Sequence, residues 1–147
     1  MTFSVMITTR NRAADLRRTC RVLQTLQPAP LEILITADGC TDDTVAVVKA
    51  ELPEAKLIVN ETGRGSVASR DRMMRAARGD LVLALDDDSY PEQADCLARI
   101  APLFEQRPQL AIAHFPQRTD EYPETLAQTD FGPARPMRSR HCCARKT

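Results

Sequence analysis

Apolar runs of strand length alternate with amphipathic segments of helix length over residues 1–115 of this chain. Strands are expected at 3–8, 31–36, 56–59, 81–85 and 110–114. Helices are expected between them, at 13–26, 42–52, 66–78 and 91–106. Short strands joined by helices of this length require right-handed crossovers, and continuously apolar strands are typical of sheets covered on both faces. The alternation therefore predicts an α/β fold with a mostly parallel sheet between two helical layers.

Two of the expected helices have a well-defined apolar face. The segment 66–78 is expected to turn Val67, Met74 and Ala77 inward and to end with Gly79 at its C-cap. The segment 91–106 is expected to turn a second set inward, namely Leu97, Ile100 and Phe104.

Composition excludes several classes of protein. The 147 residues are enough for one domain, and 20 basic residues balance 20 acidic ones, which gives no bulk attraction to nucleic acid or membrane. The N-terminus has no secretory pattern, and no apolar run is long enough to span a bilayer. The five cysteines are odd in number and lack paired metal-ligand spacing, so reduced thiols and a cytoplasmic location are expected.

The strand at 81–85 runs directly into three consecutive carboxylates, Asp86, Asp87 and Asp88. Adjacent acids repel one another, and a divalent cation with hard oxygen ligands is a suitable partner for them. Open α/β sheets bind their ligands at the carboxyl ends of the strands, which is where this cluster is expected. A plain alternative is a solvated loop whose acids and Ser89 cap the following helix.

Three polar loops are expected at the same sheet edge: 8–12, 37–43 and 86–91. Their convergence predicts a crevice for a nucleotide or a phosphate. No Gly-x-Gly-x-x-Gly follows the first strand and no Gly-Lys-Ser/Thr occurs, which argues against a dinucleotide oxidoreductase and a P-loop enzyme. Taken alone, Asp38-Gly39 is an ordinary turn, Asp42 is an N-cap, and Arg70 lies on the wet face of a helix.

Four motifs in the same order resemble family 2 glycosyltransferases. Residues 4–12 resemble that family's opening strand and loop, and residues 32–44 resemble its acidic second loop. The run 85–88, followed by Pro91, is similar to its Asp-x-Asp metal motif (DxD motif). The remaining resemblance lies in Asn60, Gly65, 69–71 and 77–80.

This resemblance implies a GT-A-type, Rossmann-like three-layer sandwich that binds a nucleoside-diphosphate sugar. It implies that Asp88, with Asp86, holds Mg²⁺ or Mn²⁺ against the diphosphate, and that Asp87 contacts the ribose. A metal there offsets the charge that grows on the leaving nucleoside diphosphate. The other implied contacts are Thr8 and Arg10 beside the nucleotide, Asp38 accepting from the base, and Arg70 near the diphosphate.

The resemblance also divides the chain. Residues 1–115 are expected to be the nucleotide-sugar-binding domain, and 116–147 the irregular start of an acceptor region with a basic tail. The family's catalytic base is an acid in the acceptor half, and no acid after Glu105 matches a motif, so no base is assigned. Ala37 also stands where the family's second loop usually begins with an acid.

Three functions are compatible with these motifs. The first is inverting transfer of a sugar from a nucleoside-diphosphate donor to the hydroxyl of an unidentified acceptor, a glycan, a lipid or a small molecule. The second is a catalytically inactive module that binds the donor alone. The third is a nucleotidyltransferase, although such enzymes usually have a glycine-rich basic loop after the first strand, and Thr8-Thr9-Arg10-Asn11 is not one. No nucleic-acid partner is expected.

Overall fold

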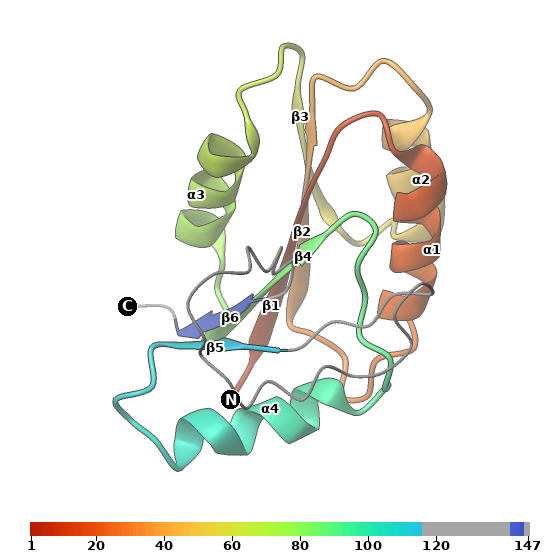
Figure 1. The fold of residues 1–147 in the computed structure, drawn as a ribbon. Coiled ribbons are helices and arrows are strands. Elements are labelled where there is room, and N and C mark those ends of the chain that lie inside the picture. Colours follow the sequence, from red (N-terminus) through yellow and green to blue (C-terminus); the bar gives the residue numbers. More distant parts are fainter. Residues whose placement is uncertain (116–141, 146–147) are drawn as a thin grey trace, which may run out of the picture.

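A six-stranded sheet with strand order β3-β2-β1-β4-β6-β5 forms the centre of the molecule. The computed structural model describes residues 1–115 and 142–145 of the chain (Figure 1). The strands are β1 (Phe3–Thr9), β2 (Glu32–Asp38), β3 (Lys56–Asn60), β4 (Leu81–Asp86), β5 (Ile112–His114) and β6 (Cys142–Arg145). The helices are α1 (Ala13–Leu23), α2 (Thr44–Glu51), α3 (Ser66–Ala76) and α4 (Cys96–Glu105).

The first four strands pair in parallel, which confirms the predicted fold class. β1 lies between β2 and β4, so Thr8 at its carboxyl end is in register with Thr36 on one side and Asp86 on the other. β3 pairs with the outer side of β2 and places Asn60 opposite Asp38. The carboxyl ends of all four strands therefore meet at one edge of the sheet, as we predicted from the three polar loops.

Alternate residues of the strands enter two separate cores, one on each face of the sheet. The larger core joins Val5 and Ile7 to apolar residues of α1, α2 and α4, and the predicted inward set Leu97, Ile100 and Phe104 belongs to it. The smaller core joins Met6 and Leu34 to α3. Figure 1 shows α1 and α2 on one side of the sheet and α3 on the other. The predicted three-layer arrangement follows from this alternation.

Two details predicted for the third helix are wrong. Val67 is 81% exposed, whereas Ala77 and, in part, Met74 pack inward as predicted, together with Met73. The inward side also buries the polar Ser69, which obscures the apolar period in the sequence. The helix ends at Ala76, and Ala77 already has extended backbone with φ −63° and ψ 139°. Gly79 is therefore not the C-cap. It lies against β1, where a Cβ would come within 2.5 Å of the Ser4 nitrogen.

The remaining elements depart from prediction at their ends. α4 begins at Cys96, five residues later than the Pro91 expected, after a turn segment. The sequence did not predict β6, which takes Cys142–Arg145 of the basic tail and pairs antiparallel with both β4 and β5. The rest of the region from 116 onward, including every acid considered as a base, lies outside the described residues. In the part that is described, no helix is long and apolar enough to cross a membrane.

Candidate nucleotide and metal site at the carboxyl edge of the sheet

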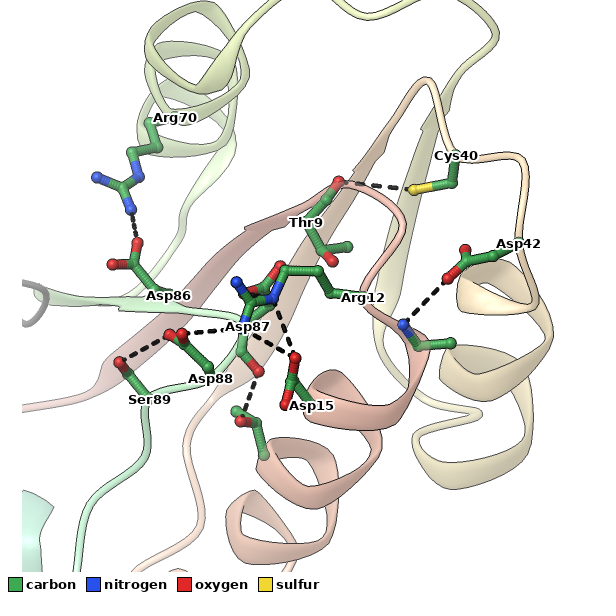
Figure 2. Close-up of polar contacts among 12 residues, drawn as sticks. Thr9, Arg12, Asp15, Cys40, Asp42, Arg70, Asp86, Asp87, Asp88 and Ser89 are labelled. Carbon is green, nitrogen blue, oxygen red and sulfur yellow. Dashed lines mark hydrogen bonds and ion pairs between the residues drawn. The ribbon is translucent and has the colours of Figure 1, made fainter. Parts of the chain in front are cut away.

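The three consecutive aspartates are separated by the alternation of the strand that carries them. Asp86 is the last residue of β4, on the face covered by α3, and it forms an ion pair with Arg70 of that helix. Asp87 lies toward α1, and its backbone carbonyl accepts a hydrogen bond from the Thr19 hydroxyl over 2.8 Å. Figure 2 shows Asp86 directed at Arg70 and the other two acids on the side of Arg12. Asp86 is thus separated from Asp87 and Asp88, which reduces the repulsion expected within the triplet.

Arg12, the residue that precedes α1, contacts two of the three acids. Its Nε lies 3.2 Å from Oδ1 of Asp87, and its Nη2 lies 3.0 Å from Oδ2 of Asp88. The same Nη2 also donates to Oδ2 of Asp15, in the first turn of α1, over 2.8 Å. One guanidinium group therefore connects the loop after β4 to the start of α1 (Figure 2).

Asp87 is the most buried member of the triplet, with its side chain 10% exposed. Burial raises the pKa of this carboxyl, and the neighbouring Asp88 and Asp86 raise it further, while Arg12 opposes the shift. Carboxyl groups with raised pKa values are frequent at binding sites, because a cation or a hydrogen-bond donor from a ligand would stabilise their charged form.

The donor set of this cluster fits a magnesium or manganese ion. Four carboxylates, from Asp15, Asp86, Asp87 and Asp88, are paired with two guanidinium groups, which leaves a formal net charge of −2. The side chains of Asp86 and Asp88 are 29% and 22% exposed, so solvent reaches them. Within the described residues no three Asp, Glu, His or Cys side chains form a complete metal site. A metal at Asp86 and Asp88 would therefore need further ligands, and Mg²⁺ usually takes them from substrate phosphates.

Asp38 is placed differently from the triplet. It is 3% exposed, at the end of β2, and its carboxylate accepts three hydrogen bonds from the last residue of β3 and from the loop that follows it. Oδ1 accepts from the side chain of Asn60 over 2.7 Å and from the Arg64 backbone over 2.9 Å, and Oδ2 accepts from the Gly65 backbone over 2.8 Å. The backbone N–H of Arg64, with the other two donors, holds the pKa of Asp38 below its usual value in spite of burial. Asp38 therefore fixes the 60–65 loop, and its contact with a base stays a prediction.

The loops after β1 and β2 are tied to each other at the same edge. Asn11 has a left-handed backbone, with φ 53°, and its side-chain oxygen accepts from the Thr41 backbone over 2.7 Å. Asp42 accepts from the backbone N–H of Ala13 and of Thr44, the first residues of α1 and α2. The prediction that Asp42 is the N-cap is wrong by one residue, because the N-cap of α2 is Asp43.

The loop after β2 contains a glycine whose backbone packs closely against the loop after β3. Gly39 has φ +69°, and a Cβ on it would lie 2.6 Å from the backbone nitrogen of Gly63. A Cβ on Gly63 would in turn lie 3.2 Å from a terminal nitrogen of the Arg10 guanidinium. Arg10 thus reaches across from the end of β1 to cover this close approach between two loops.

We expect the substitution Gly39→Ala to destabilise the protein by about 3 kcal/mol. A left-handed conformation costs a non-glycine residue about 1–2 kcal/mol, and overpacking against backbone adds about 1–3 kcal/mol. Gly65→Ala is a comparison without a clash, because no atom lies within 4 Å of its Cβ position, although its φ of 89° and ψ of 153° are essentially restricted to glycine. Urea unfolding measures both losses. A loss in Gly39→Ala below about 2 kcal/mol, the cost of the left-handed conformation alone, would show that the contact with Gly63 contributes nothing.

The structure brings most of the predicted site residues to one edge but not to one point. Thr8 lies in the centre, between Thr36 and Asp86, and its buried hydroxyl has no hydrogen-bond partner among the described residues. Asp86 and Asp88, the predicted metal pair, are engaged by arginines from different elements. The buried hydroxyls of Thr9, Thr36 and Ser69 also have no hydrogen-bond partner among the described residues, so this property does not distinguish Thr8 as a ligand contact.

Sequence reasoning assigned no role to Arg12, Asp15 or Asn60. Arg12 and Asn60 stand inside the quoted motifs, so their positions were visible. Their partners were not, because Arg12 contacts residues about 76 positions away and Asn60 contacts one 22 positions away. The only local signal was the spacing of Arg12 and Asp15, which is that of neighbours on a helix.

The chain matches one family of known proteins over almost its whole length. The profile of glycosyl transferase family 2 matches residues 4–142. A protein of Haemophilus influenzae described as an uncharacterized glycosyltransferase is 27% identical over 119 residues. That alignment covers 80% of this chain and 39% of the relative, so the chain spans well under half of that relative's length.

Solved structures with the same fold include proteins with nucleotides bound. TarS of S. aureus, residues 1–349, in complex with UDP aligns with a TM-score of 0.76 and 20% identity, over 99% of this chain and 47% of TarS. A mannosyltransferase of Pyrobaculum calidifontis in complex with GDP-Man and Mn²⁺ aligns with a TM-score of 0.69 and 21% identity, over 79% of this chain and 35% of that protein. At these identities the two structures establish the GT-A fold of this chain.

Proposed function

Because the chain belongs to glycosyl transferase family 2, we propose that it binds a nucleoside-diphosphate sugar through a divalent metal and serves inverting transfer of that sugar to an acceptor hydroxyl. The observation that carries this proposal is the acidic cluster at the end of β4. It has a net charge of −2, lies at the carboxyl edge of a parallel sheet, and is reachable by solvent.

The named complexes of the structural neighbours support the proposal. One neighbour holds UDP, and another holds GDP-Man with Mn²⁺. Since this chain spans only 35% and 47% of those proteins, the activity and substrates are proposed for it rather than transferred. The family match also favours a glycosyltransferase over a nucleotidyltransferase.

The proposed roles follow the surroundings of each side chain. Asp88, with Asp86, would hold Mg²⁺ or Mn²⁺, and the bound ion would supply positive charge to the leaving diphosphate. Asp87 is fixed by burial and by Arg12, which suits a carboxylate that accepts hydrogen bonds from the ribose hydroxyls. Arg70 is 39% exposed and adjoins Asp86, so its guanidinium can also contact phosphate oxygens.

The nucleotide itself would lie over the end of β1. Thr8 lies at that end in register with Asp86, and Arg10 offers a flat guanidinium beside the two contacting loops. Asp38 would contribute mainly by holding the 60–65 loop in place, in addition to the predicted base contact.

Calorimetric titration of the purified chain tests the proposal. UDP-GlcNAc and GDP-Man are titrated with and without MnCl₂. We expect one of the two to bind only in the presence of the metal. Binding that is independent of metal, or no binding of either donor, would contradict the metal-assisted donor site. Donor binding without release of nucleoside diphosphate over a range of glycan, lipid and small-molecule acceptors would favour the inactive-module alternative.

A further inference from the structure

Arg12 places a positive charge beside the acids that the proposed metal ion would also contact. It contacts Asp87 and Asp88 over 3.2 and 3.0 Å, so it already supplies positive charge to both of these acids. Arg70, in contrast, is paired with Asp86 alone on the opposite face of the sheet. Figure 2 shows the Arg12 side chain lying across the acids from the α1 side.

Asp15 gives the guanidinium of Arg12 a second partner. Nε and Nη2 of Arg12 donate to Oδ2 of Asp15 over 3.1 and 2.8 Å, within the same first turn. The Arg12 side chain is 44% exposed and Asp15 is 51% exposed, so this pair can persist while the contact with Asp88 opens. Exposed ion pairs are individually weak, and exchanging one of them therefore meets little resistance.

We propose that Arg12 is a positioning residue that competes with the divalent metal for Asp88 and couples metal binding to donor binding. With no nucleotide present, Arg12 holds Asp88 and repels a second cation. When a nucleoside diphosphate arrives, its phosphates accept hydrogen bonds from the guanidinium, and Asp88 is released to the metal. This inference rests on the proposed donor function.

Thermodynamic linkage makes the consequence measurable. If the diphosphate relieves the competition, it strengthens metal binding, and the metal strengthens diphosphate binding by the same factor. Removing Arg12 removes both the competitor and the group that senses the phosphate. The metal should then bind more tightly alone, and UDP should improve its binding less.

The test uses Mn²⁺ and UDP as probes on the full chain. Free Mn²⁺ is counted by its electron paramagnetic resonance signal, with and without UDP. We expect Arg12→Gln to raise Mn²⁺ affinity without UDP by roughly tenfold, since a unit charge about 5 Å from a divalent ion repels it by that order even in water. UDP should then enhance Mn²⁺ binding by a smaller factor than in the wild type. Arg12→Lys, which keeps the charge, should remain near the wild type without UDP.

Two further variants separate this role from a merely structural one. Arg17→Gln removes a half-exposed arginine of the same helix whose partner is Glu51, and it should leave both affinities unchanged. Asp15→Asn should weaken Mn²⁺ binding by a larger factor in the wild-type background than in Arg12→Gln. In both backgrounds it removes the attraction of one carboxylate, but only in the wild type does it also leave Arg12 with Asp88 as its remaining exposed partner.

The outcomes separate this inference from the function beneath it. Failure of the wild type to bind Mn²⁺ together with either UDP or GDP would overturn both, and where GDP is the nucleotide that binds, it replaces UDP as the probe throughout. Joint binding in the wild type with Arg12→Gln and Arg17→Gln behaving alike would overturn the role of Arg12 alone. If Arg12→Gln fails to give a cooperative thermal transition, the comparison between Arg12→Lys and Asp15→Asn carries the test. Equal losses of Mn²⁺ affinity in those two variants would then contradict the proposal.

Discussion

Asp88→Ala is expected to weaken metal-dependent binding of the nucleoside-diphosphate sugar by at least about 100-fold. Groups that merely orient metal ligands already contribute 10–100-fold to metal affinity, so a direct ligand should contribute no less. The measurement is calorimetric titration of the donor in the presence of Mn²⁺, compared with the wild type. Because Asp88 and Arg12 are both accessible to solvent, the free energy of unfolding should change by no more than about 1 kcal/mol.

Asp95→Ala is the matched control for this prediction. Asp95 is an acid seven positions later in the chain, 53% exposed and paired with Arg99, so its removal deletes the same charge outside the cluster. Donor binding should be unaffected in this variant. Equal losses in Asp88→Ala and Asp95→Ala would mean that overall charge, rather than a metal at Asp88, governs binding. No loss in Asp88→Ala would remove the metal role.

The fold was predictable because its signals are local. Ile7, Leu34, Leu83 and their neighbours form apolar runs that only a doubly covered sheet can bury, and the intervening helices enforce parallel pairing. The edge of the sheet where the site lies follows from this topology alone. The errors arose where polarity masks structure. The buried Ser69 obscures the inner face of α3, and the strand Cys142–Arg145 is too short, and too close to the basic residues around it, to give a recognisable strand pattern.

The location of the site was predictable from the sequence, but the pairing of its side chains was not. The acid triplet and Thr8 can be placed from strand ends, since parallel strands bring their carboxyl ends together. The pairing of Asp88 with Arg12, however, spans 76 positions and depends on where α1 begins. Membership of the metal pair, the contact of Asp38 with a base, and a cytoplasmic location stay predictions from the sequence.

Asp38→Ala is expected to destabilise the protein by about 2–4 kcal/mol. The change leaves the Asn60 side chain and two backbone N–H groups without their acceptor, and hydrogen bonds to a charged group contribute about 1.5–3 kcal/mol each when the partner is buried. Arg64 and Gly65 are exposed, so water recovers part of that loss. Urea unfolding measures the difference, and Asp43→Ala is the control, since Asp43 is exposed and makes no side-chain capping hydrogen bond.

The pH dependence of this loss identifies the charge as its source. The pKa of Asp38 is lowered in the folded state, so its stabilisation is fully present above the ordinary aspartate value of about 3.9 and is lost as pH falls through the lower folded value. The stability difference between the wild type and Asp38→Asn should be constant at neutral pH and should shrink below about pH 4. A variant that keeps wild-type stability at all pH values but loses donor binding would instead make Asp38 a reader of the base, as the sequence alone predicted.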